Sequence, residues 1–321
     1  MKAEAIGVLS QGGESGDAIA RAIERAGRTV VRVRVDRGPD VFAMLSNTSI
    51  QAAFLALSGP MAASVRGALE LLRIPYTGSS SMASYLSSDK LKTKELLRLH
   101  NVPTPPYYQL ITTDRDSPVA EKHGSFGFPV MVKPRRRGMG LASRANNLAE
   151  LTRAMERAFC HDDSALVERY IGAQPIAVAI LEGKVLGAVP KNPAPAAPAL
   201  SPTRYRGVLN LAEQAARALE TSGPVLVDVL VTEGQNEYVL EVDAAPNLTQ
   251  NSVFSRIARA DGLSFGELCE AVLSLARLHT RILASANPSS ESPVVRTVHA
   301  EVPARRLAKG SDLSWRRSRT A

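Results

Sequence analysis

The chain has 321 residues, 45% of them hydrophobic, and a formal net charge of +8 at pH 7. This length and composition predict a soluble globular protein with two or three compact units, each with its own core. No uninterrupted apolar run approaches the ~20 residues of a membrane-spanning helix, and the first residues enter a strand-like segment without an export signal. We therefore expect a cytoplasmic protein with no membrane partner.

Half of the positive charge comes from the end of the sequence. From residue 286 to residue 321, seven Lys or Arg residues oppose three Asp or Glu residues, a difference of +4. This segment is rich in Ser, Pro and Arg and has weak apolar periodicity, which predicts a basic, disordered tail. It lacks the alternation of aromatic and basic residues that a nucleic-acid stacking platform needs, so the sequence argues against a nucleic-acid partner.

The two cysteines, Cys160 and Cys269, fit neither a disulfide framework nor a zinc site by their spacing. We expect both to be small core residues.

Strands and helices alternate through the first part of the chain. Residues 5–10 form an apolar strand, followed by a glycine-rich turn and a helix that carries Ile19, Ala22 and Ile23 on one face. Two further strands are expected at 29–35 and 50–57, and a helix at 62–74. This order predicts a doubly wound parallel α/β domain over residues 1–86.

The middle of the chain predicts a mixed α and β segment over residues 87–172. A helix is expected at 88–100, a strand at 127–134, a glycine-punctuated loop at 135–143, a helix at 146–159 and a strand at 165–171. In the second helix we expect Leu148, Leu151 and Met155 to share the buried face.

The segment 173–285 is expected to carry two hairpins. Strands at 176–181 and 184–190 flank a turn, an Ala/Pro loop covers 191–207, a helix covers 209–220, and strands at 224–231 and 237–246 form the second hairpin. A last helix at 264–279 begins with Ser264 and Glu267, which have the spacing of a capping box.

Three acidic residues converge in the second hairpin. Glu241 and Asp243 are two residues apart on one strand and share a face, and the turn places Asp228 opposite residue 240 or 241. Carboxylates this close repel unless a cation compensates them, and ligands that are all oxygen suit Mg²⁺. The alternative is a solvated sheet face, although the flanking Val and Leu residues would make such a face poorly solvated.

Groups that suit phosphate precede these carboxylates. Lys90 and Lys133 are cationic, and Lys133 ends a strand that looks buried, where its ammonium should meet an anion. Gly138 and Gly140 allow backbone N–H groups to approach oxygen atoms closely. Together with the acids, they predict a site for a metal-bound nucleotide.

The order of these motifs resembles the ATP-grasp superfamily, and within it the D-alanine–D-alanine ligase family, over about residues 1–280. The strongest segments are "IPYTGSSSMASYLSSDKLKTKELLRLHNVPTPPY", "GFPVMVKP", "ALVERYI" and "LEVDAAPNLTQNSVFSRIARADGLSFGEL". The resemblance implies an N-terminal α/β domain followed by a two-subdomain ATP-grasp fold, with borders near residues 86, 172 and 285.

The resemblance also implies a role for each candidate residue. Lys90 and Lys133 would contact the phosphates of ATP, and the loop from Arg137 through Gly138 and Gly140 to Ala142 would cover them. Glu168, Arg169 and Ile171 would hold the adenine edge. The magnesium ions, two of them, would be bound by Asp228, Glu241 and Asp243. On the substrate side, Ser252 would bind the carboxylate of the acceptor amino acid. Glu14 loosely matches the Glu with which the family binds its first substrate.

Several positions depart from the family pattern. Leu226 stands where the family has Arg, Pro175 where a ribose-binding Glu is expected, and Ser58 where the family has His. The metal-binding Asn of the family is Asp243 here. The amino-acid pocket therefore differs from the usual one.

The resemblance implies an ATP- and Mg²⁺-dependent carboxylate–amine ligase that acts through an acyl phosphate on small amino-acid-like substrates. Such a ligase would serve peptidoglycan biosynthesis, and homodimers are usual in the family. The alternative is a non-catalytic or regulatory ATP-binding relative, which Leu226 and Pro175 would favour.

Overall fold

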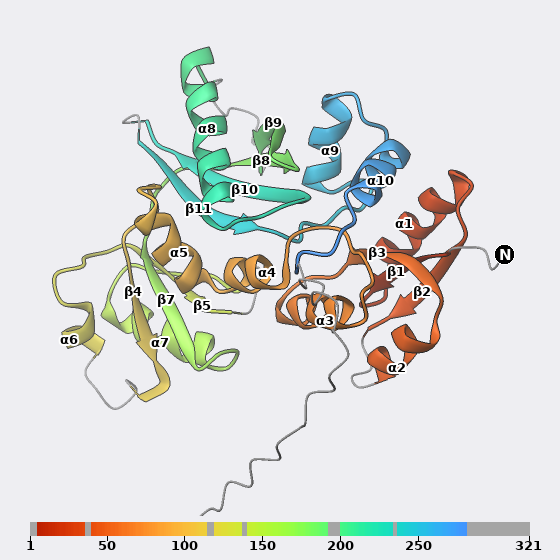
Figure 1. The fold of residues 1–321 in the computed structure, drawn as a ribbon. Helices are drawn as coiled ribbons and strands as arrows, with labels where there is room; N and C mark the ends of the chain where they lie inside the picture. Colours follow the sequence, from red (N-terminus) through yellow and green to blue (C-terminus); the bar gives the residue numbers. More distant parts are fainter. Residues whose placement is uncertain are drawn as a thin grey trace, which may run out of the picture. The chain divides into compact units, whose positions relative to one another are not determined.

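The computed structural model describes residues 5–35, 40–113, 119–136, 140–191, 200–233 and 236–280. Contacts group the chain into one compact unit that ends at Thr280 and a second, Arg281–Ala321, which lies outside the described residues together with the predicted tail. Figure 1 shows three sheets in the first unit. Each sheet falls within one predicted segment; the borders near residues 86 and 172 stay predictions.

The first sheet is parallel, as predicted, with strand order β2-β1-β3. One of its faces packs on α1, through Ile19 and Ile23, and the other packs on α2 and α3. Helices therefore cover both faces, as in a doubly wound fold. The elements are β1 (Ala5–Ser10), α1 (Glu14–Arg25), β2 (Val30–Arg34), α2 (Asp40–Asn47), β3 (Ile50–Ala56) and α3 (Pro60–Leu71).

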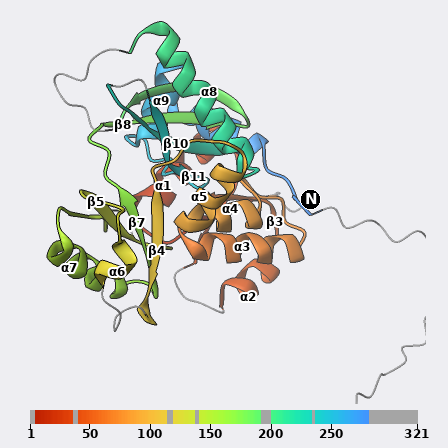
Figure 2. The same cartoon turned by 90° about the vertical axis from the view of Figure 1, so that its left-hand side faces the viewer.

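Two short helices join this domain to the second sheet. These are α4 (Ser81–Ser88), capped by the Ser80 side chain, and α5 (Lys90–Leu99), capped by the Asp89 side chain. Both helices contact β11 of the third sheet, and Figure 2 shows them between the sheets. The sequence predicted α5 but assigned no element to residues 81–87, which form most of the serine-rich α4.

The second sheet is antiparallel, with order β4-β7-β5-β6, and α7 packs on one face. Leu151 and Met155 are buried there as predicted, but Leu148 is 41% exposed. It starts the helix directly after the Asn147 cap, beyond the edge of the core. The elements are β4 (Tyr107–Ile111), α6 (Val119–His123), β5 (Val130–Pro134), β6 (Ser143–Ala145), α7 (Leu148–Phe159) and β7 (Ser164–Arg169).

The third sheet is also antiparallel, with order β11-β10-β8-β9. The helix α8 covers one face, while α9 and α10 pack between the other face and the first sheet. The helix α8 starts at Pro202, inside the expected loop, because Ser201 caps it. The elements are β8 (Pro175–Leu181), β9 (Lys184–Pro190), α8 (Pro202–Ala218), β10 (Pro224–Val231), β11 (Glu237–Asp243), α9 (Val253–Ala260) and α10 (Phe265–Ser274).

The end of the described chain is bound to the first domain. The capping box of Ser264 and Glu267 is present, but α10 ends at Ser274 rather than continuing to residue 279. Arg277 instead pairs with Tyr76 in an isolated antiparallel bridge.

Among the described residues, no helix is long and apolar enough to cross a membrane.

Candidate active site

Three carboxylates lie on one face of the third sheet. Asp228 on β10 pairs with Glu241 on β11, and Asp243 lies two residues further along β11. Directly opposed residues of an antiparallel pair point to the same side, as do residues two apart on one strand. The predicted register of this hairpin is therefore confirmed.

The other face of the same hairpin is apolar. Val227, Val229 and Val242 are buried under α8. This alternation fixes the direction of the acids, because a slip by one residue would turn them into the α8 core.

Asp228 is buried, and only one of its two carboxylate oxygens has a hydrogen-bond partner among the described residues. Its side chain is 4% exposed, and Oδ2 accepts from the ammonium of Lys191, which follows β9. Oδ1 is buried and has no hydrogen-bond partner among the described residues. Burial raises the pKa of Asp228, against the opposing charge of Lys191.

The neighbouring acids are electrostatically coupled to Asp228. Burial, together with the charges of Glu241 and Asp228, raises the pKa of Asp243 to about 6, although its Oδ1 accepts from Ala245 N at 2.9 Å. Within the described residues, no group of three His, Cys, Asp or Glu side chains has the spacing of a metal site. The three carboxylates therefore lie on one face of the sheet and interact electrostatically, but their side chains are not arranged around a common point as metal ligands would be.

A second charged cluster lies where β5 and β7 meet α5. Lys133 Nζ is 2.8 Å from Glu168 Oε2, and Lys94 Nζ is 3.5 Å from Glu168 Oε1. Lys94 also donates to Thr104 Oγ1 at 2.7 Å. Lys133 therefore meets an anion, as expected for an ammonium at the end of a buried strand.

These neighbours set the charge states of the cluster. Burial opposes ionisation of Glu168, but the charges of Lys133 and Lys94 hold its pKa below the usual value. Burial lowers the pKa of Lys94 to about 8. Sequence reasoning missed Lys94, although it follows Lys90 by four residues in an expected helix and so shares its face.

Asp89 connects the start of α5 to the glycine-punctuated loop. Its Oδ1 accepts from Leu91 N and Lys92 N at 3.1 and 3.2 Å, and its carboxylate pairs with Arg135 at 2.7 Å. The backbone of Lys90 donates to Arg135 O at 3.1 Å. Of the predicted loop residues, Arg137 and Gly138 lie outside the described residues; Gly140 is exposed, with φ +90°.

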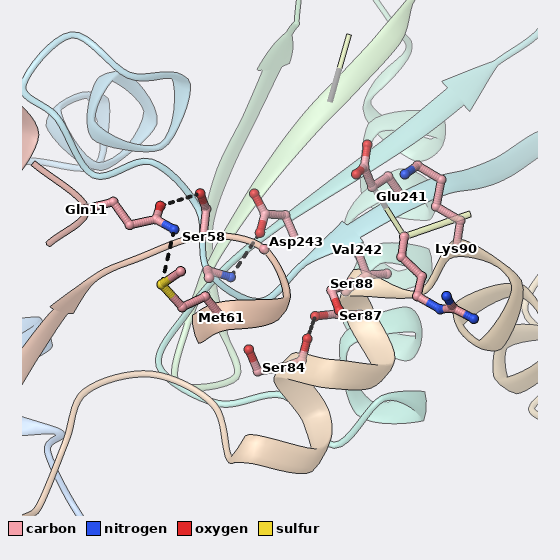
Figure 3. A pocket seen from close by; sticks show the side chains of 13 residues that line it. Gln11, Ser58, Met61, Ser84, Ser87, Ser88, Lys90, Glu241, Val242 and Asp243 are labelled. Atoms are coloured by element: carbon pink, nitrogen blue, oxygen red, sulfur yellow. Dashed lines mark hydrogen bonds between the residues drawn. The ribbon is translucent and has the colours of Figure 1, made fainter. Parts of the chain in front are cut away.

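A cavity of about 560 Å³ lies beside the carboxylates (Figure 3). Gln11, Ser58 and Met61 line the side formed by the first domain, and three serines of α4 line another: Ser84, Ser87 and Ser88. Lys90, Arg136, Glu241 and Asp243 supply the charged groups of its lining. Figure 3 shows the Lys90 side chain pointing toward Glu241. The cavity lining thus brings together one predicted phosphate residue, Lys90, and two predicted metal residues, Glu241 and Asp243, whereas Lys133 and Asp228 are not among the lining residues.

The remaining predicted residues lie elsewhere or have other contacts. Glu14 is exposed in the first turn of α1 and does not line the cavity, whereas Gln11 does. Ser252 caps α9 by accepting from Ser255 N at 3.2 Å. The Arg169 side chain donates to Phe126 O, and Ile171 is half-buried just after β7.

The cysteines differ from each other. Cys269 is buried in α10, as predicted, but Cys160 is exposed. Cys160 follows the last turn of α7, where the helix leaves the core.

Known proteins match both the sequence and the fold. A family model described as D-ala D-ala ligase C-terminus matches residues 96–195 and 191–274. The D-alanine–D-alanine ligase of Geotalea uraniireducens is 36% identical over 306 residues, which cover 87% of this chain and 97% of that relative. The chain belongs to the D-alanine–D-alanine ligase family. A second relative so named, from Geobacter sulfurreducens, is 35% identical over 82% of this chain and 89% of its own length.

Solved structures extend the comparison to the fold. The crystal structure of the D-alanine–D-alanine ligase from Bacillus anthracis complexed with ATP matches with a TM-score of 0.75 and 26% identity, covering 85% of this chain and 97% of that one. The VanG D-Ala:D-Ser ligase from Enterococcus faecalis has a TM-score of 0.72 at 19% identity, over 85% of this chain and 99% of its own, a likeness of fold alone. The chain is an ATP-dependent C–N ligase with the ATP-grasp fold.

Membership of the D-alanine–D-alanine ligase family gives the departures a structural setting. Leu226 lies opposite Asp243 on the carboxylate face and packs against the core shared by α1, α9 and α10. Ser58 lines the cavity, where its hydroxyl lies 3.5 Å from Gln11 Oε1. Pro175 begins β8. The ligases among the relatives support the catalytic prediction over the non-catalytic alternative.

Proposed function

We propose that this ligase joins the carboxyl group of one small amino acid to the amino group of a second, with D-alanine as the first candidate for both. The carboxylate would attack the γ-phosphorus of ATP and release ADP. The amine would then attack the carbonyl carbon, and phosphate would leave with one of the carboxylate oxygens. The names of the relatives at 36% and 35% identity support D-alanine.

The mixed charge of the cavity lining carries this proposal. Lys90 and Arg136 supply positive charge, while Glu241 and Asp243 supply negative charge, within about 560 Å³. A nucleotide phosphate and a small amino acid together present both signs of charge. A cavity for one apolar ligand would not need four ionisable side chains.

The acidic residues supply the oxygen ligands that magnesium prefers, although their side chains are not gathered around one point in this structure. Asp228, Glu241 and Asp243 offer only oxygen ligands on one sheet face, and the buried Oδ1 of Asp228 lacks a hydrogen-bond partner among the described residues. An unsatisfied buried carboxylate oxygen is costly, and a divalent cation would satisfy it. When bound, magnesium would neutralise charge on the transferred phosphoryl group.

The side chains of the first domain and α4 would hold the amino acid. Ser87 Oγ donates to Ser84 O at 3.0 Å and Ser88 Oγ donates to Tyr85 O at 2.8 Å, so each hydroxyl directs its hydrogen to the helix. The hydroxyl oxygens therefore remain acceptors. They would accept from the ammonium group of the substrate once magnesium occupies the carboxylates.

The basic side would hold the phosphates. Lys90 is fixed by its backbone bond to Arg135 O, and Arg136 by its backbone bond to Asp162 Oδ2 at 2.7 Å. These bonds hold the backbones of both residues, so the two side chains extend toward an anion from fixed positions. They support the predicted phosphate role of Lys90.

The test is an incubation of the full chain with Mg-ATP and single or paired D- and L-amino acids. ADP release and the mass of the amide product are measured. The variants Asp228→Asn and Glu241→Gln should lose amide formation while their far-UV circular dichroism stays native. Asp261→Asn, on the exposed end of α9, is the matched control and should stay active.

Amide formation from D-alanine supports the full proposal, and amide from another amino acid corrects only the substrate. Nucleotide binding without amide from any pair of the panel would contradict the proposed reaction and favour the non-catalytic alternative.

A further inference from the structure

Lys191 brings a positive charge into the carboxylate face from a distant strand. It directly follows β9, and its backbone N–H donates to Pro175 O at 2.9 Å, which continues the ladder between β8 and β9. Its ammonium forms an ion pair with Asp228 Oδ2. The Lys191 side chain is 34% exposed, whereas that of Asp228 is 4% exposed.

The sheet is built to let this side chain cross it. β9 and β10 are separated by β8, so the two backbones lie about 10 Å apart at the usual strand spacing. The residue of β8 that pairs with Asp228 is Ala177, whose small side chain leaves room above the strand. A larger residue at 177 would block the path of the lysine.

The ion pair satisfies only part of the acidic face. Lys191 also interacts electrostatically with Glu241 and Asp243. However, it reaches a single oxygen of Asp228 and leaves buried Oδ1 without a hydrogen-bond partner among the described residues. Lys90 and Lys133 also interact electrostatically with Glu241 and Asp228, respectively, but neither has a hydrogen bond to Asp228 Oδ1, so this buried oxygen remains open to a divalent cation.

Lys191 and magnesium would need the same carboxylate. A magnesium ion demands close oxygen ligands in octahedral geometry, and an ammonium already bonded to Asp228 occupies part of that space. The lysine can leave at low cost, because its long side chain is partly exposed and water can solvate the freed ammonium.

We propose that Lys191 is a placeholder cation, a positioning residue that neutralises Asp228 before magnesium binds and is displaced from it when magnesium arrives. The proposal rests on the proposed function, since it requires a metal on the carboxylate face. The exchange keeps the buried carboxylate compensated in both states. Its cost is a weaker apparent affinity for the metal.

The test compares the full-length protein with Lys191→Met and Lys191→Arg. Lys184→Met, at the exposed start of β9, is the control. Binding of Mn²⁺ is measured by electron paramagnetic resonance with and without ADP, and thermal unfolding is measured without metal. We expect Mn²⁺ to bind Lys191→Met at least about fivefold more tightly than it binds wild type. We expect Mn²⁺ to bind Lys191→Arg more weakly than it binds wild type, because Arg forms a stronger ion pair with a carboxylate than Lys does.

Stability without metal should follow the opposite order. Lys191→Met should unfold at a lower temperature than wild type, Lys191→Arg should not, and Lys184→Met should match wild type in both measurements. If Lys191→Met does not fold, the comparison of Lys191→Arg with wild type still tests the exchange.

A third measurement follows the lysine itself. Mass spectrometry after brief acylation should show Lys191 becoming more reactive when Mg²⁺ is added, while Lys184 stays unchanged. Equal Mn²⁺ affinity in wild type and the Lys191 variants, or unchanged Lys191 labelling, would overturn the placeholder role and leave the ligase proposal intact. Absence of Mn²⁺ binding to every form, with or without ADP, would instead remove the metal site on which both depend.

Discussion

Lys133 Nζ lies 2.8 Å from Glu168 Oε2, and Lys94 Nζ lies 3.5 Å from the other oxygen of the same carboxylate, which is 2% exposed. One buried anion thus compensates two cations at the junction of β5, β7 and α5. It holds the ammonium of Lys133 in place at the end of β5. Glu168, predicted to hold the adenine edge, is therefore an ion-pair partner of Lys133, the lysine predicted to contact phosphate.

Glu168→Gln should be strongly destabilising. The substitution leaves Lys133 and Lys94 without their anion, and breaking a buried ion pair by removing one partner costs about 3–5 kcal/mol. Urea unfolding measures the loss, and the KM for ATP should rise because Lys133 is no longer held. Glu156→Gln, exposed on α7, is the control and should change stability by less than about 0.5 kcal/mol. A Glu168→Gln protein as stable as wild type would show that the pair is dispensable.

The stability difference between wild type and Lys94→Met should depend on pH. Burial lowers the pKa of Lys94 to about 8 in the folded protein, while the unfolded chain has a normal lysine pKa near 10.4. Below pH 8 both states hold the proton, so the difference is constant. Between pH 8 and 10.4 the unfolded state binds more protons, and wild type should gain stability relative to Lys94→Met, up to about 3 kcal/mol.

Urea unfolding of both proteins from pH 7 to pH 10.5 measures this difference. A difference that stays flat, or that falls with pH, would contradict the lowered pKa.

Asp89→Ala should affect both stability and nucleotide binding. It removes the α5 cap and leaves Arg135 unpaired, which we expect to cost about 3–5 kcal/mol. Because Arg135 O receives the Lys90 backbone N–H, the KM for ATP should rise as well. Asn147→Ala removes the cap of α7 far from the cavity, and it should cost about 1 kcal/mol with no change in KM. Equal KM values in the two variants would argue against the anchoring role of Asp89.

The native protein should present one reactive thiol. Cys160 is exposed, whereas Cys269 is 1% exposed and burial raises its pKa to about 12. The thiolate is the reactive form, so Cys269 should stay unmodified at pH 8. Titration with an aromatic disulfide should give one fast thiol per native chain, none in Cys160→Ala, and two after unfolding in guanidinium. Two fast thiols in the native protein would mean that α10 opens readily.

Regular patterns in the sequence predicted much of the fold. Alternation along 224–231 and 237–246 identified the hairpin and the pairing of Asp228, because one face had to be apolar. The capping box at Ser264 and the buried face of α1 followed from local spacing in the same way.

The sequence was less informative where tertiary contacts determine whether a segment is helical, whether a residue is buried or which residues meet. The helix α4 is polar and short, and it is stabilised by the Ser80 cap and by the buried Arg66 side chain, which donates to Ser84 Oγ. Leu148 and Cys160 were predicted to be buried, but they lie at the two ends of α7, beyond the hydrophobic core that the middle of the helix contacts. Lys191 follows a β-strand and precedes an Ala/Pro segment, and only the order of the strands brings it to Asp228.

The most direct test of the central claim, ATP-dependent activation of a carboxylate, is an oxygen-transfer experiment. The full chain is incubated with Mg-ATP and the amino acid that supports amide formation, labelled with ¹⁸O in both carboxyl oxygens, and the released phosphate is analysed by mass spectrometry. We predict phosphate that carries one ¹⁸O atom for each amide formed. Phosphate without ¹⁸O, released together with amide and ADP, would contradict the account.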